Sequence, residues 1–212
     1  VPQRPQGSSG NEDVEQRYQA ALNGSTGDTG ADPRQPRLAA YRLELKDWDE
    51  TEPEDQWYDS EWPVLAKGRG HVIFAAAKSG KSLFTLWLCV RYARQGIKVL
   101  YLDYEMTPND YFERLGDMGV EQTDPILDST LFYISLPSMD GVDTKSGALD
   151  VLEACAAWEI NLVVIDTTAK GVEGPEDKSD TFRAFSRVLG TPLKGKGIGW
   201  VRVDHEGLAA GR

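Results

Sequence analysis

The chain has 212 residues, a formal net charge of −11 and two cysteines. Its length suffices for one α/β domain with a sizeable core. Its longest apolar runs, such as 83–90, are too short to cross a bilayer and no secretory signal is apparent, so we expect a soluble, cytoplasmic protein without membrane contact. Cys89 and Cys155 lie in apolar, helix-like stretches without metal-ligand spacing, which favours buried free thiols over a disulfide or a zinc site.

The negative charge is concentrated in one part of the chain. Residues 41–62 contain nine acidic and two basic residues, whereas residues 63–212 carry a net charge of only −3. The globular part is therefore close to neutral, and its net charge neither favours nor excludes a nucleic-acid partner.

The N-terminal third lacks the periodicity of a folded core. Residues 1–37 are rich in Gly, Ser, Pro, Gln and Asn, which predicts a disordered tail or linker. Residues 38–66 form an acidic arm in which Trp48, Trp57 and Trp62 could pack on the domain edge. Two interpretations of this arm stay open: a solvated connector anchored by its aromatic residues, or an acidic docking strip for a partner.

From residue 67 the sequence alternates between strand and helix signals. It predicts strands at 71–76, 98–103, 131–135, 161–166 and 198–204, and helices at 82–95, 107–118, 148–158 and 180–189. Continuously apolar strands that alternate with helices are typical of a parallel sheet covered on both faces. We therefore predict an α/β core over residues 67–212.

A phosphate-binding loop is predicted between the first strand and the first helix, at the sequence AAAKSGKS. A tight loop can turn its amides inward, a following helix directs its N-terminus at an anion, and a lysine and a hydroxyl can reach phosphate and Mg²⁺. Ala75 stands where the usual pattern has glycine. We expect ATP and Mg²⁺ here, bound by Ala75, Ala76, Ala77, Lys78, Ser79, Gly80, Lys81, Ser82 and Leu83.

Three further residues follow predicted strands. Asp166 ends an apolar strand, where it could hold Mg²⁺ together with Ser82. Glu105 would lie beside the phosphate loop if the second strand neighbours the first; it could then activate water, or it could merely precede the next helix. His205 could sense the γ-phosphate or be a structural group.

These segments together resemble the RecA-like P-loop ATPases, and most closely the RepA-like and DnaB-like replication ATPases of phages, plasmids and actinobacteria. The resemblance covers about residues 57–207 and rests on KSGKS, KVLYLDYEMTPNDYFERL, LVVIDTTAKG, SDTFRAF with TPLKGKGI, and VRVDHEG. It implies that Glu105 is the catalytic base and that His205 couples the γ-phosphate to DNA-binding loops near 169–179 and after Glu206. It also implies helicase-type ATP hydrolysis, a DNA partner and a homo-oligomer, usually a hexamer.

The chain also departs from these relatives. They usually continue His-x-Gly-Lys, whereas this chain has Leu208 at the lysine position and lacks the later strands and the Lys/Arg finger that acts on a neighbouring subunit. We therefore expect a RecA-like core that is truncated at its C-terminus. A regulatory or recombinase-type ATPase, and a module that binds nucleotide without turnover, stay open as alternatives.

Overall fold

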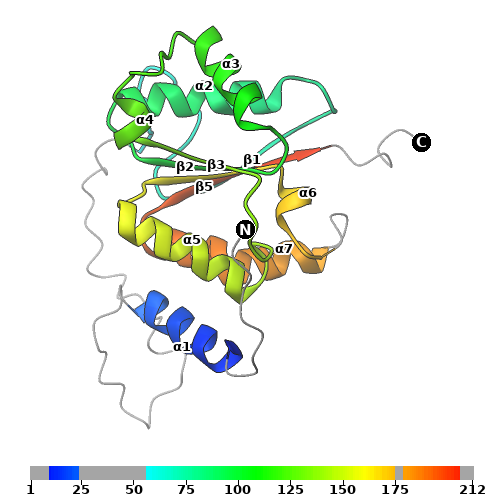
Figure 1. Ribbon diagram of the computed structural model, residues 1–212. Coiled ribbons are helices and arrows are strands. Elements are labelled where there is room, and N and C mark those ends of the chain that lie inside the picture. The colour runs from blue at the N-terminus through cyan, green and yellow to red at the C-terminus, as the bar shows by residue number, and fades with distance from the viewer. Residues whose placement is uncertain (1–9, 24–55, 175–178, 206–212) are drawn as a thin grey trace.

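A five-stranded parallel sheet forms the centre of the protein (Figure 1). The computed structural model describes residues 10–23, 56–174 and 179–205. In spatial order the strands are β1 (Gly70–Ala75), β5 (Gly199–His205), β4 (Leu162–Asp166), β2 (Val99–Asp103) and β3 (Leu131–Ser135). Every residue of β2 and β4 is buried, which explains why both sequences are continuously apolar up to a final aspartate.

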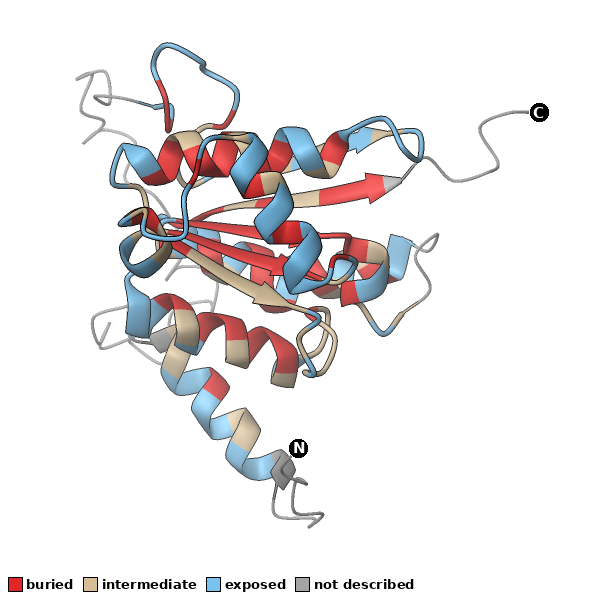
Figure 2. Cartoon of the chain, turned by 45° about the horizontal axis from the view of Figure 1, so that its top comes forward, coloured by how far each residue is buried: buried red, intermediate tan, exposed pale blue. Residues whose placement is uncertain are grey.

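Helices cover both faces of the sheet (Figures 1 and 2). One face carries α2 (Lys81–Arg94), α3 (Pro108–Asp117) and α4 (Ile126–Ser129). The other carries α5 (Lys145–Trp158), α6 (Thr168–Gly171), α7 (Ser179–Phe185), a π-helical turn η3 (Ser186–Gly190) and α8 (Thr191–Gly195). Each face has its own cluster of buried apolar side chains, so the core consists of two layers separated by the sheet.

The predicted α/β fold is confirmed, with small differences in element boundaries. Helix α5 begins at Lys145 rather than at 148, because the Thr144 side chain accepts a hydrogen bond from the Gly147 amide and caps the extra turn. The predicted helix 180–189 is present as α7 followed by η3. The short helices α4, α6 and α8 were not predicted.

The assumption that the second strand neighbours the first is wrong. Strands β5 and β4 lie between β1 and β2. The physical reason is that the strands differ in how much apolar surface they must bury. Strand β4 is apolar on both faces and therefore takes a central position. Val72 and Phe74 of β1 are exposed, which an edge strand permits.

The prediction of disorder is wrong for Gly10–Asn23, which forms helix α1 on the outer side of α5 (Figure 1). The Tyr18 side chain is buried, and its hydroxyl donates a 2.6 Å hydrogen bond to the Val188 carbonyl. Arg17 forms a 2.7 Å ion pair with Glu153 on α5. Four apolar residues of α1 are spaced to share one face, namely Val14, Tyr18, Ala21 and Leu22. This face packs against α5. The rest of 1–37 lies outside the described residues.

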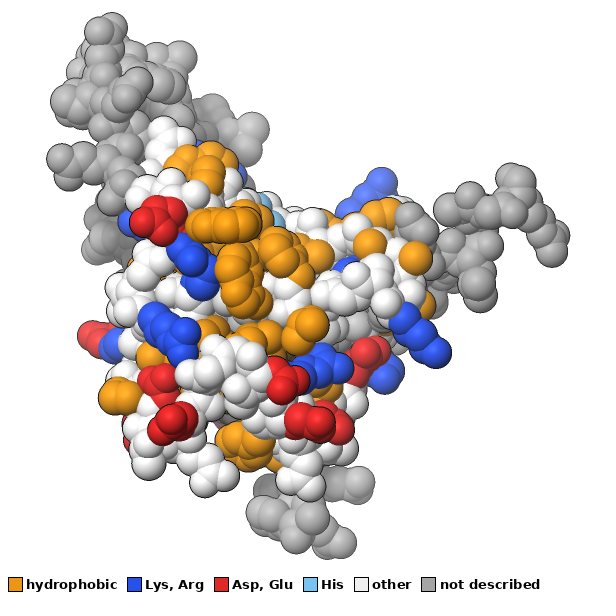
Figure 3. Space-filling view, turned by 90° about the horizontal axis from the view of Figure 1, so that it is seen from above, with side chains coloured by type: hydrophobic (Ala, Val, Ile, Leu, Met, Phe, Trp, Pro, Cys, Tyr) orange, Lys and Arg blue, Asp and Glu red, His pale blue; other side chains and the backbone are white. Residues whose placement is uncertain are grey.

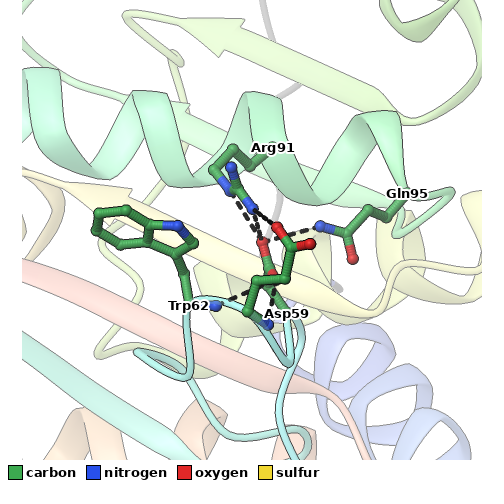
Figure 4. Close-up of polar contacts among 5 residues, drawn as sticks. Asp59, Trp62, Arg91 and Gln95 are labelled. Carbon is green, nitrogen blue, oxygen red and sulfur yellow. Dashed lines mark hydrogen bonds and ion pairs between the residues drawn. The ribbon is translucent and has the colours of Figure 1, made fainter.

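Within the predicted acidic arm, residues 56–66 pack against α2 (Figure 4). The Asp59 carboxylate is 3% exposed and accepts hydrogen bonds from Arg91 at 2.6 and 2.8 Å and from Gln95 at 2.9 Å. The Tyr58 hydroxyl donates to the Asn161 carbonyl at 2.6 Å and thereby ties the arm to the start of β4. Residues 38–55 of the arm lie outside the described residues.

An aromatic cluster of Trp62, Phe84 and Trp87 lies on the outer side of α2. The Trp62 ring meets Trp87 edge to face, and Phe84 stacks on Trp87. Trp62 and Phe84 remain 49% and 41% exposed. Figure 3 shows hydrophobic side chains gathered on this face among groups of both charges. No helix in the described part of the chain is long and apolar enough to cross a membrane.

We expect Tyr18→Phe to loosen the docking of α1. The substitution removes only the hydroxyl that donates to the Val188 carbonyl, so we expect the free energy of unfolding to fall by about 1 kcal/mol. Amide exchange in 10–23 should become faster. Gln16→Ala, on the exposed side of α1, is the matched control. Unchanged exchange in Tyr18→Phe would contradict the docking.

Candidate active site

The carboxyl ends of four neighbouring strands meet at one edge of the sheet. In the parallel register Asp103 of β2 lies opposite Asp166 of β4, and Ala75 of β1 lies opposite His205 of β5. Ligands of open α/β sheets bind at this edge, where the chain leaves one strand for a helix. The predicted site residues therefore converge although they are far apart in the sequence.

The loop between β1 and α2 contains two residues with positive φ and leads directly into a helix N-terminus. Lys78 and Gly80 adopt left-handed backbone angles, with φ of 61° and 88°. Helix α2 begins at Lys81 directly after Gly80, and no side chain caps its N-terminus. The first amides of a helix lack intrahelical acceptors and carry the positive end of the helix dipole. This N-terminus is thus suited to bind phosphate oxygens.

The Lys81 side chain lies over this loop. It is 6% exposed, and its ammonium group donates hydrogen bonds to the carbonyls of Ala75 at 3.0 Å and Ala76 at 2.9 Å. These contacts hold the positive charge beside the amides of the helix start. A phosphate bound here would meet both the lysine charge and the helix N-terminus.

A cavity of about 790 Å³ opens between this loop and helix α3. Its volume lies in the range of small-molecule and cofactor sites. Six lining residues come from the loop and the start of α2, two from the turn after β2, and four from α3: Lys78, Ser79, Gly80, Lys81, Ser82, Leu83, Glu105, Met106, Asp110, Glu113, Arg114 and Asp117.

The Asp166 carboxylate is 1% exposed and accepts hydrogen bonds on both oxygens. The Ser82 hydroxyl donates to Oδ1 at 3.1 Å, and the Tyr101 hydroxyl donates to Oδ2 at 2.6 Å. Burial raises the pKa of Asp166 above its usual value, and the two hydrogen bonds oppose this effect. The structure thus joins the end of β4 to the start of α2 across 84 residues of sequence.

The chemistry of this pair fits Mg²⁺. A carboxylate and a hydroxyl are hard oxygen donors, and Mg²⁺ in phosphate sites commonly takes one or two protein ligands, with water and phosphate oxygens supplying the rest. Among the described residues no cluster of three or more His, Cys, Asp or Glu side chains is placed to hold a metal by itself. Ser82 and Asp166 are therefore suited to a metal that arrives with a phosphate ligand.

Asp103 fixes the position of Glu105. The Asp103 side chain is fully buried, and its Oδ1 accepts hydrogen bonds from the amides of Glu105 at 2.7 Å and Met106 at 2.8 Å. Its Oδ2 accepts a 3.0 Å hydrogen bond from the Tyr133 hydroxyl. This turn directs the chain from β2 towards the cavity, so Glu105 shares the cavity with Lys81 even though β1 and β2 are not neighbours.

The structure places the predicted residues in four groups. Residues 78–83 and Glu105 line the cavity, whereas Ala75, Ala76 and Ala77 are not among its lining residues. Asp166 lies beside Ser82. For His205 only the backbone is described, at the end of β5, so its sensing role stays a prediction.

Two supporting residues were missed by the sequence analysis, namely Tyr101 and Asp103. Both lie within a strand that reads as ordinary apolar core, and only the pairing of β2 with β4 brings Tyr101 to Asp166. The available signal was their spacing: Tyr101 and Asp103 are two residues apart, so their polar groups lie on the same face of the strand near its end.

Comparison with known proteins gives one family. A family model described as an AAA domain matches residues 33–207, which is more than half of the chain. A separate comparison with curated proteins gives no match.

We expect Tyr101→Phe to weaken metal-dependent binding at this site, most strongly at low pH. Its hydroxyl stabilises the ionised form of Asp166, so its removal raises the pKa of this carboxyl further and protonation occurs at higher pH. Titrations of Mg²⁺ with ATP present, at several pH values, should show a higher half-saturating Mg²⁺ concentration than for the unmodified chain. The difference should grow as the pH falls.

Tyr92→Phe is the control, because it removes another buried hydroxyl from the same face of the sheet. Identical Mg²⁺ and pH dependence in Tyr101→Phe and the unmodified chain would show that this hydrogen bond does not support the metal site.

Proposed function

The chain belongs to the AAA domain family, and from this premise we propose that it binds ATP with Mg²⁺ and hydrolyses it as part of a DNA-replication assembly. The observation that carries the ATPase proposal is the contact between Ser82 and Asp166, which lies directly beside Lys81 and the uncapped N-terminus of α2. A helix start, a lysine, a hydroxyl and a carboxylate are the groups that phosphoryl transfer requires.

In the proposed reaction each residue has a separate task. The amides at the start of α2 and the ammonium group of Lys81 bind the β- and γ-phosphates, and Ser82 and Asp166 would hold Mg²⁺. The metal would neutralise charge on the phosphates. Glu105 accepts the proton of a water molecule whose oxygen bonds to the γ-phosphorus, while the bond from that phosphorus to the β,γ-bridging oxygen breaks and ADP leaves.

The biological role follows from the resemblance to replication ATPases. We propose that single-stranded or duplex DNA is the partner of the whole protein and that a homo-oligomer, most simply a hexamer, is its working form. The resemblance assigns residues 169–179 to a DNA-binding loop. Of the described residues in this range, 169–171 belong to α6 and residue 179 begins α7. Binding of DNA there would act on the segment that carries the metal-binding carboxylate.

We expect Lys81→Ala to abolish ATP binding, because it removes the only lysine charge held against the loop carbonyls of Ala75 and Ala76 in the described structure. Calorimetry with MgATP measures this loss. Lys98→Ala, which removes a lysine paired with Glu159 on the surface, is the matched control and should bind as the unmodified chain does. ATP affinity retained in Lys81→Ala would rule out the phosphate loop.

We expect Glu105→Gln to keep its MgATP affinity while hydrolysis falls roughly 10²-fold or more, the usual scale for a lost general base. Phosphate release should be measured with and without single-stranded DNA. Stimulation by DNA in the unmodified chain, absent in Glu105→Gln, would support a replication motor. A hydrolysis rate that is the same with and without DNA would favour a different partner. Equal hydrolysis by Glu105→Gln and the unmodified chain would refute the role of Glu105.

A further inference from the structure

Helix α6 brings a second charged residue to Glu105. The Lys170 ammonium group lies 3.4 Å from Glu105 Oε1, and the Thr167 hydroxyl donates to the same oxygen at 3.4 Å. Thr167 and Lys170 follow Asp166 by one and four residues. The segment that directly follows Asp166 therefore contacts Glu105, the carboxylate that lines the cavity after β2.

The backbones on both sides of this contact are tied together. The Tyr104 amide donates to the Asp166 carbonyl at 2.7 Å, and the Glu105 amide donates to Asp103 at 2.7 Å. Helix α6 packs so closely on the adjacent ring that a Cβ at Gly171 would lie 2.9 Å from the Tyr104 side chain. Lys170 and Glu105 thus extend from two segments whose spacing is fixed.

We propose that Lys170 is a positioning residue that orients the Glu105 carboxylate for proton abstraction. This inference rests on the proposed function, in which Glu105 is the general base. With Thr167 and Lys170 both on Oε1, the two contacts restrict the orientations open to the carboxylate. A general base must lie within hydrogen-bond reach of its water, so a fixed orientation raises the fraction of productive encounters.

A contribution to folding does not account for the pair. The side chains of Lys170 and Glu105 are 57% and 35% exposed, and ion pairs at such positions contribute little to stability. A nucleotide in the neighbouring cavity would displace bulk solvent from around the pair. The attraction between the two charges would then increase, because it is screened less. The contact is therefore most effective when the substrate is in place.

The position of Lys170 separates its effect from substrate binding. Lys170 is not among the residues that line the cavity, whereas Lys78 and Lys81 are. Removal of its charge should consequently change the chemical step and leave the phosphate contacts intact. A lysine that bound the phosphates would instead change the affinity for ATP.

The test compares Lys170→Ala with Lys170→Arg and with the control Lys194→Ala, which alters an exposed lysine on α8. We expect Lys170→Ala to lower kcat about tenfold with the dissociation constant of MgATP unchanged, since only orientation is lost. Lys170→Arg should restore most of kcat. Lys170→Ala introduced into Glu105→Gln should cause no further loss, because Lys170 acts only through Glu105.

Four results would overturn the proposal: unchanged or increased kcat in Lys170→Ala, a weaker MgATP affinity, no recovery with arginine, or a full additional loss in the double variant. The outcomes also separate the two proposals. If Glu105→Gln hydrolyses ATP normally, the general-base assignment fails and the role of Lys170 fails with it. If Glu105→Gln is impaired but Lys170→Ala is not, only the role of Lys170 fails.

Discussion

A carboxylate buried at the end of a central strand is costly unless both of its oxygens are paired, and the site depends on how Asp166 meets this constraint. Its partners, Ser82 and Tyr101, come from the first helix after the loop and from the neighbouring strand β2. The hydrogen bond from Ser82 ties the start of α2, and with it the preceding loop, to the sheet. It also places Asp166 beside Ser82, which lines the cavity.

The cavity carries both charges, which constrains what can enter it. Lys78 and Lys81 face it from the loop. The turn after β2 and α3 contribute one cation, Arg114, and four carboxylates: Glu105, Asp110, Glu113 and Asp117. A bare triphosphate would be attracted by one wall and repelled by the other, whereas the complex with Mg²⁺ carries less negative charge. Under the proposed function, this arrangement would favour the metal complex as the ligand.

Local patterns in the sequence predict the backbone elements that surround the candidate site. The loop from Ala75 to Ser82, the strand that ends at Asp166 and the cap that follows Glu105 are each encoded within a few residues, and all are present. The strand order cannot be predicted from local patterns. Strands β5 and β4 lie between β1 and β2, and how deeply each strand is buried depends on the assembled sheet. For the same reason the partners of Asp166 and the docking of α1 through Tyr18 could not be foreseen from their own segments.

The two cysteines of the chain occupy opposite layers of the core. Cys89 lies on α2 in the layer that borders the cavity, and Cys155 lies on α5 in the layer beneath the sheet. Burial raises the pKa of both thiols, that of Cys155 to about 12, so neither reacts readily while its layer is closed. The rate at which each thiol reacts with an alkylating reagent therefore measures how often its layer of the core opens. The unmodified chain thus allows local opening to be measured separately on each side of the sheet.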